Sequence, residues 1–259
     1  MAGMKYYPPM SIAEYQEFVR TRYEEFDRKV AVDQMVMRLF EEATELISPV
    51  QEASRNWARA SQDVVSSLAD ILPWLCGICT SIPIDLERAM EWKYGKGCPI
   101  CGRMPCECRP PQPVVARPEP PEDLFEYPKV LKRQRTLDAW QSHLREMYKD
   151  NLQFNINVLP LKLLEDIASM GKIVRTRRSF KSDKEWKAEI AWRAASILAW
   201  TIAICNYFND VSNTNLHLHQ ITFEKYSSDY LQRKTMKEAQ QLGVIKCPKC
   251  GFEWASLQT

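Results

Sequence analysis

Three glutamates crowd one short segment of the chain, LFEEATELI at residues 39–47: Glu41, Glu42 and Glu45. On a helix, Glu41 and Glu45 stack one turn apart and Glu42 lies beside them, because residues i and i+4 share a face. Like charges at that spacing destabilise a helix by about 0.2–0.5 kcal/mol per pair. A divalent cation would offset the repulsion, and Mg²⁺ prefers carboxylate oxygens. The spacing therefore indicates either a magnesium site or a solvated acidic face.

A second acidic element follows in QDVVSSLADILPWL, residues 62–75, where Asp63, Ser67 and Asp70 occupy positions i, i+4 and i+7 of an expected helix. Asp70 stands among leucine, alanine and isoleucine, and a carboxylate in such a setting is costly unless it has a partner. Packing Asp70 towards the three glutamates around a metal would explain both features. We therefore expect the two acid-bearing helices to pack against each other.

The nine cysteines fall into two groups. Six stand in the knuckle-like segments CPICGRMPCEC and CPKC, where paired cysteines in a reducing cytosol are read first as structural zinc ligands: Cys98, Cys101, Cys106, Cys108, Cys247 and Cys250. The first four could close a local tetrahedral site, which we slightly favour and which leaves the last two needing partners. Alternatively, the two CPxCG turns face each other as a zinc ribbon. The remaining Cys76, Cys79 and Cys205 lie in apolar segments and are expected in the core.

Apolar periodicity predicts an all-α fold. In the first part of the chain the expected helices cover residues 12–26, 30–48, 58–80 and most of 82–97. Seven prolines between 110 and 128 exclude a helix there and favour an extended linker. Helical periodicity returns at about residue 134 and continues to about 243.

The two halves of the chain match each other. Gln16, Arg20 and Tyr23 align with Gln141, Arg145 and Tyr148, ILPWLCGIC with ILAWTIAIC, and CPICG with CPKCG. A duplication is therefore expected. It divides the chain into a four-helix module with the acidic metal site, a zinc knuckle, a Pro-rich linker, a second module and a C-terminal knuckle, at residues 1–97, 98–108, 109–130, 131–245 and 246–259.

The acidic pattern resembles that of the MazG-like all-α nucleoside triphosphate pyrophosphohydrolases over about residues 11–108. Their signature is EExxE on one helix and ExxD on the next long helix. Here EExxE is complete, whereas the second element reads Ser67-Leu-Ala-Asp70, with serine in place of glutamate. The segment IDLERAMEWKYGK also looks like the family's fourth helix, in which a lysine faces phosphate.

The resemblance implies that carboxylates of the two helices hold Mg²⁺ or Mn²⁺ and that water attacks the α-phosphorus of a nucleoside triphosphate, releasing pyrophosphate. Carried over, the ligands and catalytic groups are Glu41, Glu42, Glu45 and Asp70, with Asp63 compensating for Ser67. Lys93 would bind phosphate, with Lys96 as the weaker candidate. Trp92 could stack on a base, although helix-end packing is the commoner role of such aromatics.

The second half has kept fewer acids. Glu41 and Glu42 align with Glu165 and Asp166, but Glu45 aligns with Ser169 and Asp70 with Ser196. Two carboxylates are too few for a catalytic metal pair. Members of the family assemble as dimers or higher oligomers, so the tandem chain is expected to imitate a dimer with one catalytic and one supporting half; halves that pack independently are the alternative.

Two further features have modest expected roles. The basic segment 172–184 is expected to be a solvated loop between helices that could also contact phosphates. His217 and His219, in NLHLHQ, are expected to be surface or packing residues, because positions i and i+2 of a helix point to different faces.

Three functions fit the sequence. The first is Mg²⁺- or Mn²⁺-dependent hydrolysis of nucleoside triphosphates, so an enzyme is favoured. The second is a non-catalytic nucleotide-binding or scaffold protein, which Ser67 favours. The third is a zinc-bearing nucleic-acid adaptor, which the knuckles and the basic segment favour but the net charge of +2 disfavours.

The expected partners are a nucleoside triphosphate and further copies of the chain or a larger complex. The N-terminal segment MAGMKYYPPMS lacks the apolar stretch of a secretory signal. No continuous apolar run reaches the roughly 18–20 residues that span a bilayer. We therefore expect a cytoplasmic protein without membrane contact.

Overall fold

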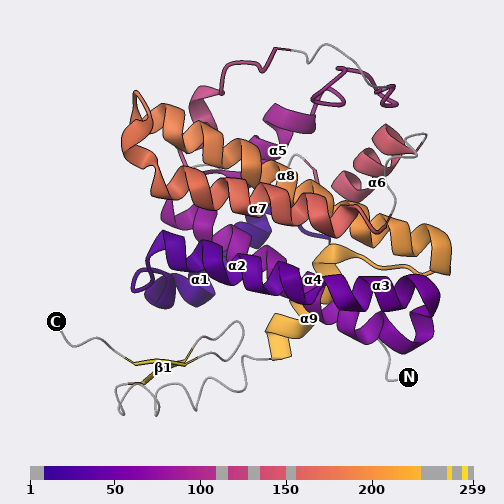
Figure 1. The fold of residues 1–259 in the computed structure, drawn as a ribbon. Coiled ribbons are helices and arrows are strands. Elements are labelled where there is room, and N and C mark those ends of the chain that lie inside the picture. Colours follow the sequence, from indigo (N-terminus) through magenta and orange to yellow (C-terminus); the bar gives the residue numbers. More distant parts are fainter. Residues whose placement is uncertain are drawn as a thin grey trace.

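The computed structural model describes residues 9–108, 116–127, 135–149, 156–228, 244–246 and 253–255, and most of these residues are α-helical (Figure 1). The elements, in chain order, are α1 (Ile12–Asp27), α2 (Val32–Glu45), α3 (Ile47–Arg55), α4 (Trp57–Ser81), α5 (Leu86–Tyr94), η1 (Glu122–Phe125), α6 (Leu137–Tyr148), α7 (Leu159–Arg175), η2 (Arg177–Ser179), α8 (Asp183–Ser212), α9 (Leu218–Ser228), β1 (Val244–Lys246) and β2 (Glu253–Ala255). The predicted all-α class is confirmed for the described residues, apart from the short antiparallel pair β1–β2. Below, the first half is residues 9–108 and the second half residues 135–228.

Local sequence sets the start of α1. Ser11 and Glu14 form the capping box that their spacing suggests: the Ser11 hydroxyl accepts from the Glu14 N–H at 3.1 Å, and the Glu14 carboxylate accepts from the Ser11 N–H at 2.7 Å. In the second half, the Thr136 hydroxyl accepts from the Ala139 N–H at 3.1 Å and begins α6 in a similar way. Both helix starts therefore follow from side chains within three residues.

The prediction of a single helix over residues 30–48 is wrong at the C-terminal end of that helix. α2 stops at Glu45, and after one helical-region residue, Leu46, the chain continues as α3. Pro49 lies in the first turn of α3, where the missing N–H has no helical partner to lose. Its position in this first turn allows the chain to remain helical to Arg55.

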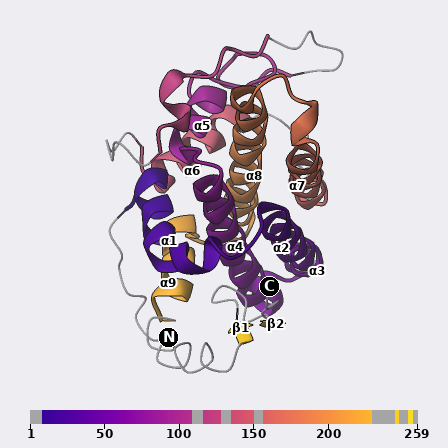
Figure 2. The same cartoon turned by 90° about the vertical axis from the view of Figure 1, so that its left-hand side faces the viewer.

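The long helices α4 and α8 form the centre of the molecule (Figure 2). α1 and α9 cover one side of this centre, and α2, α3 and α7 cover the other. Neither α4 nor α8 is a continuous apolar run, but by length and composition each is long and apolar enough to cross a membrane. In this structure 72% of each apolar window is buried, as in a core helix. Cys76, Cys79 and Cys205 are fully buried there, as predicted.

Each half contains a glutamine side chain that makes the same pair of backbone hydrogen bonds. The Gln16 side chain accepts from the Leu86 N–H at 3.1 Å and donates to the Ile84 carbonyl at 2.9 Å, which fixes α5 against α1. In the second half, Gln141 accepts from the Leu218 N–H at 2.9 Å and donates to the Leu216 carbonyl at 3.0 Å, which fixes α9 against α6. The two aligned glutamines thus do the same work at equivalent places.

The halves are also interlocked. The last helix of each half packs on the long helix of the other half: α5 packs on α8, and α9 packs on α4. α2 packs on α7, and α4 on α8. The chain before α1 pairs with the chain before α6, because Ser11 and Thr136 form an antiparallel bridge and the Leu137 N–H donates to the Met10 carbonyl at 2.8 Å.

The Pro-rich region contains more order than the expected extended linker. Residues 122–125 form the short 3₁₀ helix η1, and Leu124 is fully buried. The Asp85 N–H donates to the Leu124 carbonyl at 3.0 Å, and Arg88 pairs with Asp123 at 2.9 Å. Prolines exclude an α-helix here, but they do not prevent this apolar anchor from docking on α5.

The chain beyond α9 was expected to remain helical to about residue 243. α9 ends at Ser228, and residues 229–243 lie outside the described part, as do Cys247 and Cys250. The strands β1 and β2 flank the CPKC segment and place Lys246 opposite Glu253. The zinc-ribbon alternative is therefore not addressed by the described residues.

Candidate functional site

Four cysteine sulfurs converge directly after α5. The Sγ atoms of Cys98, Cys101, Cys106 and Cys108 all lie within 4.8 Å of one another. Cys98 and Cys108 are 3.6 Å apart, and Cys101 and Cys106 are 4.0 Å apart, measured between their Sγ atoms. A tetrahedral zinc–thiolate centre with bonds of about 2.3 Å has sulfur–sulfur edges of about 3.8 Å. The geometry therefore matches the local four-cysteine arrangement expected from the spacing.

Glycines shape this knuckle. Gly97 and Gly102 have φ angles of 138° and 71°, which residues with a side chain rarely adopt. A Cβ added to Gly97 would lie 2.9 Å from the Gly102 carbonyl oxygen. The turn is closed by the Gly102 N–H, which donates to the Cys98 carbonyl at 2.7 Å, and by the Cys98 N–H, which donates to the Arg103 carbonyl at 3.0 Å.

Backbone groups also favour the metal-binding form of one thiol. Burial opposes ionisation of Cys101, but N–H donors of Arg103 and Glu107, together with the neighbouring thiols of Cys108 and Cys98, lower the Cys101 pKa to about 7. A lowered pKa increases the thiolate fraction, and the thiolate is the form that ligates metal. The lowering applies to Cys101, whereas burial raises the pKa of the Cys98 and Cys108 thiols.

The knuckle also ties the first half to the second. The Cys106 N–H donates to the Met147 carbonyl of α6 at 2.6 Å. Close by, His143 of α6 donates through Nε2 to the Tyr94 carbonyl at 2.9 Å, at the end of α5. An ion held by these cysteines would therefore support the contact between the end of the first half and α6.

The acids of α2 do not form a closed ligand set. Glu42 is buried, Glu41 and Glu45 are exposed, and Glu41 pairs with Arg38. Within the described residues, ligand atoms of three or more His, Cys, Asp or Glu side chains gather within 4.8 Å only in the knuckle and in a set formed by Asp138, His217 and His219. The predicted acidic residues are thus on packed helices, but their carboxylates are not brought together.

Asp70 has a partner that the sequence analysis missed. Lys225 reaches it from α9 of the second half, and the Lys225 Nζ also donates to the Ser66 hydroxyl at 2.9 Å and to the Ser66 carbonyl at 3.2 Å. The signal was present in the alignment of WKY at residues 92–94 with EKY at 224–226. Sequence comparison could not show that the helices carrying these lysines are exchanged between the halves.

Lys93 consequently lies elsewhere than expected. Its Nζ donates to the Trp192 carbonyl of α8 at 3.0 Å and to the Ser196 hydroxyl, and it lies 4.6 Å from the centre of a Trp192 ring. Burial lowers the pKa of Lys93 to about 7; the Asp166 charge opposes this shift, while Arg193 adds to it. The structure therefore does not place Lys93 with the acids of α2. It places Lys93 against the position that aligns with Asp70.

A cleft of about 460 Å³ lies beside Lys93. Its walls include Lys93, Asp166, Arg193 and Ser196, together with cysteines of the knuckle. Asp166 aligns with Glu42, and its two carboxylate oxygens accept from Arg193 Nη1 and Trp200 Nε1, each at 2.7 Å. Arg193 aligns with Ser67. In the second half, the guanidinium group of Arg193 therefore pairs with the acid that aligns with Glu42.

The other predicted substrate-binding residues have separate surroundings. The Trp92 indole N–H donates to the Pro118 carbonyl at 3.2 Å, and its ring packs edge-on against Trp192 at a centroid distance of 4.9 Å. Arg117 lies over both rings, at 4.6 and 4.5 Å. Trp92 thus fastens the Pro-rich region to α8. Lys96 is exposed, as is Asp63 on α4.

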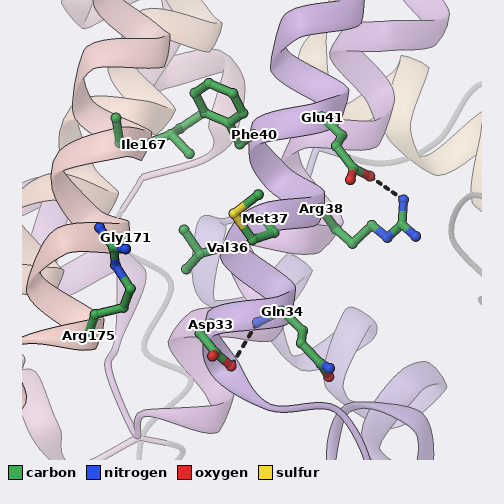
Figure 3. A pocket seen from close by; sticks show the side chains of 11 residues that line it. Asp33, Gln34, Val36, Met37, Arg38, Phe40, Glu41, Ile167, Gly171 and Arg175 are labelled. Carbon is green, nitrogen blue, oxygen red and sulfur yellow. Dashed lines mark hydrogen bonds and ion pairs between the residues drawn. The ribbon is translucent and has the colours of Figure 1, made fainter.

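A second cleft of about 480 Å³ lies between α2 and α7 (Figure 3). Val36, Met37, Phe40 and Ile167 line it with apolar groups, whereas Glu41 is at its rim and pairs with Arg38 (Figure 3). The cleft is therefore an apolar seam between the halves, and only one of the predicted acids borders it.

The basic residues of segment 172–184 are exposed, but the expected loop between helices is wrong in its extent: residues 172–175 end α7, residues 177–179 form η2, and α8 begins at Asp183. Arg177 pairs with Asp183 at 2.5 Å and lies 4.5 Å above the ring of Trp186, so part of its charge is already compensated. Arg175, Arg178 and Lys181 are solvent-exposed.

Comparison with known proteins gives no match: no family model, curated protein or solved structure corresponds to the chain. A function for this protein has to be argued from its residues and from their geometry.

Proposed function

We propose that the chain is a tandem pair of MazG-like modules arranged as a pseudo-dimer, and that its first half is a Mg²⁺-dependent nucleoside triphosphate pyrophosphohydrolase. The observation that carries the proposal is the exchange of lysines between the halves. Lys225 contacts Asp70 and Ser66 on α4, whereas Lys93 contacts Ser196 and Trp192 on α8. Two equivalent sites, each completed by the other half, are the arrangement expected of a fused dimer.

The correspondence between the halves indicates where a nucleotide would bind beside α2 and α4. In the second half, Asp166, Ser196 and Lys93 border one cleft. Their counterparts in the first half are Glu42, Asp70 and Lys225. The first half has kept a carboxylate at both acidic positions, so it is the half suited to a cation and a phosphate chain.

The donor set fits Mg²⁺ by type, because Glu41, Glu42, Glu45 and Asp70 offer only carboxylate oxygens. Bound there, Mg²⁺ would neutralise phosphate charge and lower the pKa of a coordinated water. Lys225 would hold phosphate oxygens from the opposite side, since its ammonium group is already fixed beside Asp70 by Ser66. Glu42, the buried acid of the three on α2, would orient the attacking water.

The test is pyrophosphate release from a panel of ribo- and deoxyribonucleoside triphosphates with Mg²⁺ or Mn²⁺. We expect Glu42→Gln and Asp70→Asn to abolish release. A matched pair separates the two sites: Lys225→Met should reduce turnover by roughly 100-fold or more, as for loss of one electrostatic group at a reacting centre, whereas Lys93→Met should leave most of it. No release from any nucleotide by folded, zinc-loaded protein would contradict the hydrolase proposal.

A second candidate is a non-catalytic nucleotide-binding or scaffold protein of the same architecture. Ser67 favours it, because serine is a neutral and weak ligand where the family has a carboxylate. The Asp70–Lys225 contact also favours it, because an ion pair can satisfy Asp70 without a metal. Ser67→Glu separates the candidates: gained turnover would indicate an impaired hydrolase, and unchanged nucleotide binding without turnover would favour the binding protein.

We also propose that the knuckle holds one structural Zn²⁺ through its four thiolates, on the strength of the sulfur geometry described above.

Nucleic-acid binding through the exposed basic segment remains the third candidate. It would be supported by affinity for RNA or DNA that falls steeply with salt and is lost in Arg175→Gln and Arg178→Gln.

A further inference from the structure

Two histidines and an aspartate converge where α6 meets the start of α9. The Nδ1 atoms of His217 and His219 lie 3.0 and 2.8 Å from the same oxygen, Oδ1 of Asp138. One ligand atom from each of the three residues lies within 4.8 Å of those of the other two. The residues come from segments about 80 positions apart, so tertiary folding alone brings them together.

The expectation that the two histidines point to different faces is wrong, and the reason is local. α9 begins at Leu218, so His217 belongs to the extended chain before the helix and His219 to its first turn. The i, i+2 rule for helices does not apply across a helix start. Both imidazoles therefore turn towards the first turn of α6, where Asp138 is located.

The cluster is not needed to build this part of the fold. Leu218 matches Leu86 through the shared glutamine contacts, so His217 and His219 match Asp85 and Glu87, and Asp138 matches Ala13. In the first half, a Glu87 carboxylate oxygen simply accepts from the Ala13 N–H at 3.0 Å. The same junction therefore forms without a histidine, and the second half holds a ligand set in its place.

The chemistry of the set is that of a transition-metal site. Two imidazoles and one carboxylate suit Zn²⁺ and its neighbours rather than Mg²⁺, which prefers oxygen ligands alone. Zn–N and Zn–O bonds of about 2.0–2.1 Å give ligand–ligand edges of about 3.3 Å, so small side-chain shifts from 2.8 and 3.0 Å would accommodate an ion. His219 is buried, whereas His217 and Asp138 are partly exposed and leave a path for entry.

We propose that Asp138, His217 and His219 bind one divalent transition-metal ion of the zinc class, with a coordination position left open to water. The site is separate from the cysteine knuckle and does not depend on the proposed hydrolase function. It joins α6 to α9, and two helical turns further along α9 is Lys225, which contacts Asp70. Metal at this junction would hold α9, and with it that lysine, in place.

The experiment titrates Co²⁺ alone into untagged full-length protein that carries a single equivalent of Zn²⁺, the amount that the four cysteines of the knuckle would hold, and follows stoichiometry and the visible spectrum. Wild type should bind one additional equivalent with weak d–d bands and without the intense sulfur-to-cobalt charge-transfer band that thiolate ligands produce. Asp138→Asn, His217→Asn and His219→Asn should each lose this equivalent at concentrations that saturate wild type. His143→Gln, at the one other histidine of the chain, should keep it.

Folding does not limit this test. His217 is partly exposed, so His217→Asn is expected to fold even if the buried His219 position tolerates no change, and far-UV circular dichroism checks each variant. Absence of the additional equivalent in wild type would overturn the proposal. Retention of it in folded His217→Asn and Asp138→Asn, or a thiolate-type spectrum, would overturn it equally.

Discussion

Lys93 and Lys225 show how much the surroundings of one residue type can differ between matching positions. Lys225 meets the carboxylate of Asp70, whereas Lys93 meets the hydroxyl of Ser196 and the face of Trp192. An ammonium group beside neutral partners and near Arg193 loses hydration without full compensation. This is the physical reason why the pKa of Lys93 falls to about 7.

The lowered pKa of Lys93 predicts a pH-dependent stability. Between pH 7 and the ordinary lysine pKa of 10.5, the unfolded chain binds a proton at this position that the folded chain does not. Unfolding free energy should therefore rise with pH in this window, by at most about 1.4 kcal/mol per pH unit for a single group, and should level off below it.

Urea denaturation at several pH values up to about 9.5, below the range in which tyrosines ionise, measures this slope. Lys93→Met should be more stable than wild type near pH 7 and should lack the slope. Lys96→Met, which removes an exposed lysine nearby, controls for the change in net charge. A slope that is the same in Lys93→Met and wild type would refute the assignment.

At the level of elements, one glutamine in each half decides where the last helix of that half begins. Gln16 and Gln141 are buried, and each satisfies one backbone N–H and one carbonyl at the entrance of α5 or α9. Those groups have no helical partners, because the first N–H groups of a helix lack acceptors within it. A short helix can thus pack on the other half of the chain while its start is held by its own half.

Replacing either glutamine by leucine should be costly by a similar amount. Gln16→Leu and Gln141→Leu each leave buried backbone groups without a partner, and we expect a loss of about 1–3 kcal/mol in unfolding free energy. Gln51→Leu, at an exposed position of α3, should change it by less than about 0.5 kcal/mol. Chemical denaturation gives all three values. A large cost at one buried site and none at the other would argue against equivalent halves.

For the whole molecule, the crossing of α5 and α9 makes each half depend on the other. The knuckle adds to this dependence, because the Cys106 N–H donates to the Met147 carbonyl of α6. The halves therefore share one core, built around α4 and α8, and the alternative of independently packed halves does not describe the structure.

Removal of the Zn²⁺ that we propose in the knuckle should destabilise this shared core. A strong chelator should lower the melting temperature of wild type by at least about 5 °C, since about 2 kcal/mol corresponds to roughly 4–8 °C for a chain of this size. The Cys101→Ser variant should have a lower melting temperature than wild type before chelator is added, and chelator should lower it less. Differential scanning fluorimetry measures both. An unchanged melting temperature, with zinc loss verified by elemental analysis, would remove the structural role.

Features encoded within about a dozen residues could be predicted from the sequence. The capping box of Ser11 and Glu14 and the converging sulfurs of the knuckle depend on neighbours only, so composition and spacing suffice for them. The helical class follows likewise from apolar periodicity. The acids of α2 were placed correctly on a helix packed against α4, but their role as metal ligands stays a prediction.

Only the tertiary structure decided which residues from distant segments meet. The exchange of α5 and α9 sends Lys225 to Asp70 and Lys93 to Ser196, and the start of α9 turns His217 towards Asp138. Such pairings depend on the packing of long helices over the whole chain. A local pattern fixes the face on which a side chain lies, whereas the partner of that face is set by the burial of α4 and α8 in a common core.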